Sequence, residues 1–394
     1  MFSRLCILVL FIVFLGCTNT IGIKNEQKGK LTATYYLAES EVKRILLDYE
    51  TAPKPPYMQM VEDNDGKRIL TFFNPHKYSI YAYDYDNGNL LRTIEYEKEG
   101  PDGILRLEGY YIKTMDSIYV HSYPMVELIL TDSLGNVKKK ISLRENRTDR
   151  EWYLYRPQYF FSTVNPIIEL NNKLILTGIK PFSIADSLID VFRFTSCVDW
   201  GLNNVEFFNT YPKKLYGSDV NWQDPMYMQP YTAISPLGER VFSFPVSHNI
   251  YITNDDAESY RTVYGGSNVA ETISSIDDGR ARTPNEVIHA HILGQDLYAS
   301  ILYDPYRHIY YRFMLKGIPG ATTENFYGEK PIVVIMMDEQ FNYLGETLIG
   351  NVEQWNWENT FVTREGLNIE YISVDEHDED YMTLKIFTVE EIDR

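Results

Sequence analysis

The chain has 394 residues, of which 44% are hydrophobic and 14% aromatic, including 32 Tyr and 19 Phe. This composition is sufficient to bury a large core and excludes a wholly disordered chain. The formal net charge is -18 at pH 7. Because so acidic a surface repels phosphate backbones, we expect no nucleic-acid partner.

An apolar segment near the N-terminus predicts export. The run from Leu5 to Leu15 is too short to cross a bilayer of about 30 Å as a helix, and it is typical of a signal peptide over residues 1–16. The ending Leu15-Gly16-Cys17 resembles the bacterial lipobox, whose cysteine carries the lipid. We therefore expect lipidation of Cys17 and attachment to the membrane through that lipid. The alternative is an ordinary secretory signal in which Cys17 is incidental.

Residues 17–30 are polar and contain no aromatic side chain, which is typical of a short tether between a lipid and a folded domain. They lack an acidic cluster of the kind that directs some lipoproteins to the cell surface. We therefore expect a lipid-anchored protein of the cell envelope, at the outer membrane and facing the periplasm. Cys197 lies in an apolar run, where we expect a buried and unreactive thiol.

From Leu31 onward, short runs of β-branched and aromatic residues alternate with turn sequences, and sustained helical periodicity is hard to find. The body is therefore predicted to be antiparallel β. The same order of features occurs at residues 74–81 and again at residues 304–311: a turn with Pro in its second position, then a basic residue, then an aromatic strand. With four repeats between these positions, the period is roughly 57 residues, at the long end for propeller blades.

Residues 31–394 are predicted to form a single domain, an all-β propeller of six blades with about four antiparallel strands each. Residues 31–50 lie outside the blades, and we expect a strand from this segment to complete the last blade and close the ring. The expected blades cover residues 57–97, 105–144, 158–212, 230–265, 286–349 and 352–389.

Two segments carry a resemblance to a known family. They are YDPYRHIYYRF at residues 303–313 and IVVIMMDEQFNYLGE at residues 332–346. Together with the lipobox and the acidic, tyrosine-rich body, they resemble the Bacteroides lipoproteins grouped as domain of unknown function 4221. The resemblance covers nearly the whole mature chain and implies a six-bladed propeller of the TolB-like type. Because that family has no assigned activity, the resemblance implies no catalytic residue and no cofactor.

His289 and His291 are separated by one residue, a spacing that on a strand directs both imidazoles to one face, as some metal sites require. No third ligand accompanies them, so we expect no metal and treat both as candidate ligand-binding residues on an inner strand. The acidic segments 63–67 and 375–380 suggest calcium sites. The first lacks a correctly spaced terminal Glu, and the second is typical of a solvated loop.

Aromatic residues supply the remaining candidates for a binding site. Trp355 and Trp357 would share one face of a strand, where they can stack on a sugar ring or pack between blades. Residues 316–330 interrupt the strand pattern, and in this loop Phe326 and Tyr327 are predicted to form an exposed pair that captures a partner. The chain has no Gly-rich phosphate loop and no Gly-x-Ser-x-Gly motif, so we assign no catalytic residue.

Two classes of function remain open. The first is a non-catalytic, lipid-anchored envelope propeller that binds a protein or another envelope ligand. The second is a hydrolase or lyase that acts on a glycan, with carboxylates, His289 and His291 near the central channel. A deep axial pocket with convergent polar groups would favour the enzyme, whereas a flat face with an aromatic rim would favour the binding protein.

Overall fold

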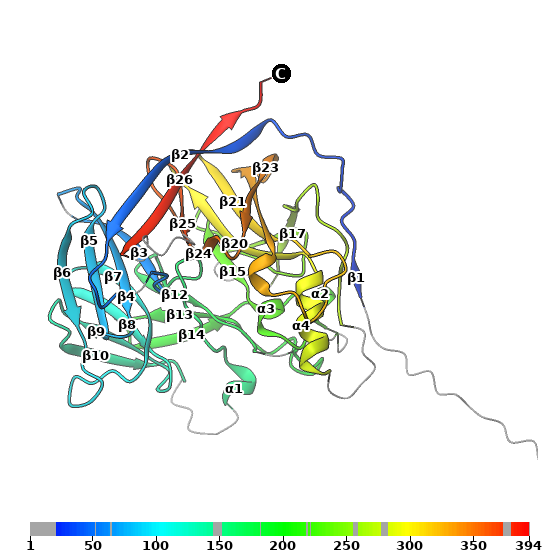
Figure 1. Ribbon diagram of the computed structural model, residues 1–394. Helices are drawn as coiled ribbons and strands as arrows, with labels where there is room; N and C mark the ends of the chain where they lie inside the picture. Colours follow the sequence, from blue (N-terminus) through cyan, green and yellow to red (C-terminus); the bar gives the residue numbers. More distant parts are fainter. Residues whose placement is uncertain are drawn as a thin grey trace, which may run out of the picture.

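The structure is a computed structural model that describes residues 21–393 apart from 52, 64, 145–151, 182, 218–219, 221, 255–258, 277–282 and 373–379. The described residues form six four-stranded antiparallel sheets, arranged as the blades of a propeller (Figure 1). The predicted all-β class and the predicted six blades are therefore confirmed. The signal peptide, Cys17 and most of the acidic segment 375–380 lie outside the described residues.

The first three blades are built from consecutive strands. In each blade the first strand is the innermost, and the inner strands of the first and second blades touch each other. From inner to outer strand, the blades are β3 (Met58–Glu62), β4 (Arg68–Asn74), β5 (Ser79–Asp84) and β6 (Leu90–Glu95); β7 (Leu107–Thr114), β8 (Ser117–Ser122), β9 (Glu127–Thr131) and β10 (Val137–Ser142); and β11 (Ile168–Leu170), β12 (Lys173–Thr177), β13 (Thr195–Asp199) and β14 (Asn204–Phe208). The middle strands are the most buried, which explains their continuous apolar runs.

The fourth and fifth blades follow the same order, and the sixth takes its outer strand from the N-terminal part of the chain. The strands are β15 (Tyr231–Ile234), β16 (Arg240–Ser243), β17 (Asn249–Thr253) and β18 (Arg261–Tyr264); β20 (Leu297–Asp304), β21 (Ile309–Leu315), β22 (Pro331–Asp338) and β23 (Tyr343–Asn351); and β24 (Trp355–Val362), β25 (Leu367–Tyr371), β26 (Tyr381–Glu391) and β2 (Tyr35–Leu46). The expected blade positions agree with these strands to within a few residues, except that the third and fifth blades begin at Ile168 and Leu297, later than the expected residues 158 and 286.

The ring is closed by pairing between the two ends of the chain, as predicted. β2 runs antiparallel to β26, with a register that extends from Tyr35 opposite Glu391 to Leu46 opposite Tyr381. Figure 1 shows these two strands, blue and red, side by side. Leu37 and Ile45 on β2 are 4% and 1% exposed, so the strand also contributes apolar side chains to the core.

Short helices occur in the connections between blades and, within the fifth blade, between β21 and β22. They are α1 (Trp152–Tyr155), α2 (Lys213–Tyr216), α3 (Pro225–Met228), α4 (Asn285–Gly294) and the 3-10 turn η1 (Tyr327–Glu329). Among the described residues, no helix has the length and the apolar character that crossing a membrane requires.

The described part of the expected tether is packed against the domain. β1 (Gly22–Ile23) pairs with β19 (Ile273–Ser274) in the connection between the fourth and fifth blades. The Asn25 side chain donates hydrogen bonds to the carbonyls of Ser267 and Ala270 at 2.7 and 3.1 Å. Polar composition suggested a free segment because it does not reveal hydrogen bonds to backbone groups elsewhere in the chain. Residues 21–30 therefore belong to the folded domain, whereas the sequence predicted a tether over residues 17–30.

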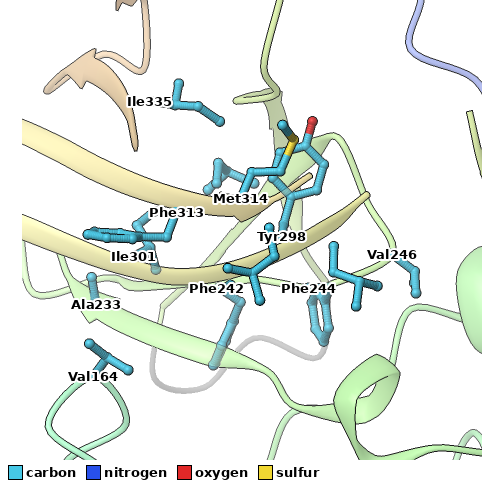
Figure 2. Packing of buried hydrophobic residues seen from close by; sticks show 14 of the residues in the cluster. Val164, Ala233, Phe242, Phe244, Val246, Tyr298, Ile301, Phe313, Met314 and Ile335 are labelled. Carbon is cyan, nitrogen blue, oxygen red and sulfur yellow. The ribbon is translucent and has the colours of Figure 1, made fainter. Parts of the chain in front are cut away.

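The fourth and fifth blades pack through a large apolar cluster, part of which is shown in Figure 2. Arg312 is fully buried within this region. Its guanidinium donates to Ser243 Oγ at 2.9 Å and to four backbone carbonyls, and it lies over the Tyr298 ring at 3.8 Å from the centroid. Because every side of the cation is satisfied, it fixes the connection between β16 and β17 against the fifth blade.

Candidate functional site

A turn formed by residues 159–165 occupies the centre of the ring. Thr163 Oγ1 accepts a hydrogen bond from the Met58 backbone NH at 2.8 Å and donates one to Asn359 Oδ1 at 2.7 Å, which connects it to the inner strands of the first and sixth blades. A Cβ atom at Gly109 on β7 would lie only 2.6 Å from Phe161, so the turn also presses against the second blade. A ligand near the axis must therefore bind beside this turn.

The same turn reaches the opposite side of the ring. Val164 belongs to the buried cluster that contains Ala233 on β15 and Ile301 on β20, the inner strands of the fourth and fifth blades (Figure 2). The connection between the second and third blades thus joins inner strands from most of the ring.

A pocket of about 340 Å³ lies beside the axial turn, around the first half of β24. Its walls come from β24 and from four connections: residues 54–56 before β3, Tyr327 in the loop before β22, Val352 before β24 and Ile372 after β25. The pocket therefore draws residues that lie far apart in the sequence to one position, which is typical of binding sites on a rigid β scaffold.

A bulge in β24 shapes this pocket. Asn356 pairs with Glu370 and Thr360 pairs with Ile369, so residues 357–359 are extra relative to β25. The Thr360 hydroxyl donates to the carbonyl of Trp357 at 2.8 Å and holds the bulge in place. A bulge redirects side chains that a regular strand would point up or down in alternation.

Glu370 stabilises the bulge through hydrogen bonds. Its carboxylate is 1% exposed and accepts three hydrogen bonds, from the backbone NH of Lys54 at 3.0 Å and from the side-chain amides of Asn356 and Asn359, each at 2.7 Å. Burial raises the pKa of Glu370, and the three donors offset part of that rise. The Asn359 amide also donates to the Pro55 carbonyl at 2.7 Å, so Glu370 positions two walls of the pocket.

Glu358 is the chemically available group in the pocket. Its neighbours Trp357 and Asn359 are 4% and 1% exposed, whereas the Glu358 side chain is open to water within the pocket. Among the described residues, the Glu358 carboxylate has no hydrogen bond and no ion pair, and the described lining contains no second carboxylate. The surrounding protein excludes much of the bulk solvent, and this desolvation raises the pKa of Glu358.

The charge of Glu358 acts on two tyrosines close to the pocket. Burial is the main reason why the pKa values of Tyr327 and Tyr231 are raised, and the negative charge of Glu358 raises them further. Both phenols therefore remain protonated and can donate or accept hydrogen bonds.

Three of the aromatic residues singled out from the sequence lie around this pocket: Tyr327, Trp355 and Trp357. The faces of both indoles are largely covered, since Trp355 is 5% exposed and packs on Tyr371 with ring centroids 4.9 Å apart, and Trp357 meets the edge of Tyr231. The tryptophans therefore form the rigid wall of the pocket.

Phe326 and Tyr327 do not form one exposed pair. Phe326 is 48% exposed, whereas Tyr327 is partly buried and lines the pocket beside β24. The loop that carries them is anchored at its end by Lys330, whose ammonium donates to the carbonyls of Ile292, Leu293 and Gln295 at 2.8–3.1 Å. Only part of residues 316–330 is therefore a surface loop.

The prediction of a strand for His289 and His291 is wrong, because both lie on helix α4. Residues two apart on a helix point in different directions, so the two imidazoles do not share a face. His291 Nδ1 lies 2.6 Å from the hydroxyl of Tyr227, and burial lowers the pKa of His291 to about 4; His289 is exposed. Neither histidine lines the pocket beside β24.

Other sequence expectations concern metals and the thiol. The described residues contain no group of three or more His, Cys, Asp or Glu side chains that could hold a metal ion. Asp63 instead closes a turn, with its carboxylate accepting the backbone NH groups of Asp65 and Lys67. Cys197 is 7% exposed on β13, as expected for a core thiol.

The fold of the chain is similar to solved structures of Bacteroides proteins. A solved structure of a DUF4221 family member from Bacteroides vulgatus superimposes with a TM-score of 0.77 at 19% identity, covering 91% of this chain and 99% of that chain. A putative exported protein from Bacteroides fragilis gives a TM-score of 0.51 at 10% identity, with 91% and 96% covered. At these identities the similarities show the fold alone. A comparison with curated proteins gives no match.

The family model described as a domain of unknown function, DUF4221, matches residues 34–348. These residues run from the start of β2 into β23 and so include the strand that closes the ring. The chain belongs to the DUF4221 family.

Proposed function

We propose that the protein is a lipid-anchored propeller of the cell envelope that binds a neutral oligosaccharide in the pocket beside β24. The observation that carries this proposal is the Glu358 carboxylate, which faces the pocket without a described protein partner. The location is supported by the apolar N-terminal segment that ends at Cys17, and by the fold shared with a putative exported protein from Bacteroides fragilis.

The chemistry of the pocket favours a ligand with many hydroxyl groups. A carboxylate accepts hydrogen bonds from neighbouring hydroxyls, and such charge-assisted bonds are stronger than neutral ones. The walls contributed by Tyr327, Pro55, Pro56, Val352 and Ile372 offer apolar and aromatic surface for the CH groups of a sugar ring. Because the lining carries one acidic residue, Glu358, and one basic residue, Lys54, its charges balance, and we expect neutral sugars rather than acidic ones.

The size of the pocket limits how much of a glycan it can enclose. Its volume of about 340 Å³ is at the lower end of the roughly 300–1,000 Å³ found for small-molecule sites. We therefore expect one end of an oligosaccharide to enter the pocket while the remainder contacts the exposed surface nearby, where Phe326 is 48% exposed.

A glycan hydrolase is the second candidate, and the raised pKa of Glu358 is the observation that favours it, because a protonated carboxyl can act as a general acid. Most glycosidases need a second carboxylate in the same cleft. Glu370, the carboxylate that holds the β24 bulge, is buried and already accepts three hydrogen bonds. Binding without cleavage is therefore the better-supported function.

A printed array of neutral and acidic oligosaccharides tests the proposal. Fluorescently labelled protein should be retained by a subset of the neutral sugars, and the retained sugar should be recovered intact after prolonged incubation. Cleavage of that sugar would identify an enzyme instead. No retention, or retention by acidic sugars alone, would overturn the assignment of a neutral glycan.

A further inference from the structure

A second pocket, of about 180 Å³, lies between the second and third blades and shares no lining residue with the pocket beside β24. It is bounded by His121 at the end of β8, by the turn that follows with Tyr123, and by Arg144 just after β10. Trp152 and Tyr159 complete the wall. The proposal made above does not depend on this pocket.

His121 is a buried polar side chain without a partner. Its side chain is 1% exposed, and neither ring nitrogen has a hydrogen bond to any described residue. The ring meets the edges of Tyr159 and Phe161, with centroids 5.5 and 5.1 Å apart. Burial lowers the pKa of His121 to about 3, so the imidazole is neutral and presents one NH donor and one acceptor nitrogen. Buried polar groups are nearly always hydrogen-bonded, so this histidine indicates a missing partner.

Arg144 adds a cation to the same pocket. Its guanidinium lies over the Trp152 ring at 5.0 Å, and one Nη donates to the Pro124 carbonyl at 3.0 Å. The Nε–H group has no partner, and among the described residues no carboxylate pairs with this arginine. An arginine that pairs with no carboxylate of the described residues can bind the carboxylate of a ligand.

We propose that this pocket binds a small hydroxycarboxylate. The carboxylate accepts hydrogen bonds from the Arg144 guanidinium, and the hydroxyl exchanges a hydrogen bond with an imidazole nitrogen of His121. The short hydrocarbon part lies against Tyr123 and Trp152. A volume of about 180 Å³ holds about six water-sized groups, which matches a molecule of the size of lactate.

Three probes of nearly equal size separate the two polar contacts. Lactate has both the charge and the hydroxyl, propionate lacks the hydroxyl, and lactamide lacks the charge. Calorimetric titration of the purified protein should show lactate binding about tenfold more tightly than either of the other two probes. Equal affinities for all three, preferential binding of inorganic phosphate, or no saturable binding of lactate would overturn the proposal.

Two variants assign the contacts to their residues. Arg144→Gln should lose the preference for lactate over lactamide, while it keeps the preference for lactate over propionate. His121→Phe should show the reverse pattern. It should also melt at or above the wild-type temperature, because it removes a buried polar group that has no partner. Either variant retaining both preferences would show that the residue does not contact the ligand.

A measurement on the wild-type protein avoids any effect of substitution on folding. With ¹⁵N-labelled histidine, the side-chain nitrogen signals of His121 should shift when lactate is added and remain unchanged when propionate is added at the same occupancy. Unchanged His121 signals at saturating lactate would place the ligand elsewhere.

Discussion

The hydroxyl of Thr163 donates a hydrogen bond of 2.7 Å to the side-chain oxygen of Asn359, which joins the axial turn to the inner strand of the sixth blade. Asn359 in turn donates to Glu370 and to the Pro55 carbonyl, each at 2.7 Å. The axial turn and the bulge that presents Glu358 are thus parts of one hydrogen-bonded unit, so the geometry of the pocket depends on a residue that does not line it.

Replacement of Thr163 with Val should therefore weaken both stability and binding. The change leaves the Met58 NH and the Asn359 oxygen without their buried partner, which should cost about 1–3 kcal/mol in the free energy of unfolding. Urea denaturation measures this loss, and Ser162→Ala in the same turn is the matched control. A Thr163→Val protein as stable as the control would show that the axial hydrogen bonds are not stabilising.

Removal of the residues before 51 should open the ring. The β2 strand pairs with β26 over its whole length, and its loss exposes the edge of β26 and several apolar side chains of the sixth blade. We expect aggregation or loss of the single cooperative melting transition. Calorimetry measures this transition. Truncation before residue 30 is the control and should leave β2 in place, although it removes the β1–β19 pairing and the hydrogen bonds that Asn25 makes to Ser267 and Ala270. Cooperative melting of the shorter protein at the wild-type temperature would contradict closure by β2.

Acidification should destabilise the protein through its buried histidines. The pKa values of His121 and His291 fall to about 3 and about 4 in the folded state, below the value of about 6.5 in the unfolded chain. The unfolded chain then binds more protons as the pH falls below about 6.5, so stability that is complete above this pH decreases toward pH 3–4. Each histidine adds a slope of at most about 1.4 kcal/mol per pH unit.

His121→Phe isolates one of these contributions. Its advantage in unfolding free energy over the wild type should grow as the pH is lowered from about 7 to about 5, because the variant has no imidazole to protonate there. Denaturant titrations of both proteins at each pH provide the comparison. The same difference at both pH values would mean that His121 titrates normally in the folded protein.

The proposed lipid anchor gives a prediction for Cys17. With Ala at this position no lipid can be attached, and the protein should remain as an unprocessed precursor or appear in the soluble fraction. Membrane fractionation at high salt distinguishes these outcomes from anchoring. Cys197→Ala, at the other thiol of the mature chain, is the control and should fractionate like the wild type. A processed Cys17→Ala protein that stays membrane-bound would exclude the lipid at Cys17.

The arrangement of blades could be predicted from the sequence because it depends on local patterns. The alternation of strands and turns, and the recurrence of residues 74–81 at 304–311, indicate antiparallel blades without knowledge of distant contacts. The strand-like pattern of residues 31–50, left outside the six blades, likewise predicted the closing strand.

The candidate sites could be predicted only in part, because they depend on contacts between distant residues. The spacing of Trp355 and Trp357 identified the correct strand, but the bulge at residues 357–359, which exposes Glu358, has no clear sequence signal. His289 and His291 were placed on a strand, although Pro284 followed by Glu286 is a typical helix start. His121 on β8 and Arg144 just after β10 meet at one pocket, and nothing in their local sequences marks them.

The affinity of wild type, Glu358→Gln and Glu353→Gln for the oligosaccharide retained on the array tests the central claim most directly. Glu353 is an exposed carboxylate five residues before Glu358 that does not line the pocket, so it provides the matched control. By isothermal titration calorimetry, Glu358→Gln should bind about tenfold or more weakly, since a charge-assisted hydrogen bond is lost, while Glu353→Gln should bind like the wild type. Equal affinity of all three proteins would contradict the assignment of Glu358 as the ligand-binding group.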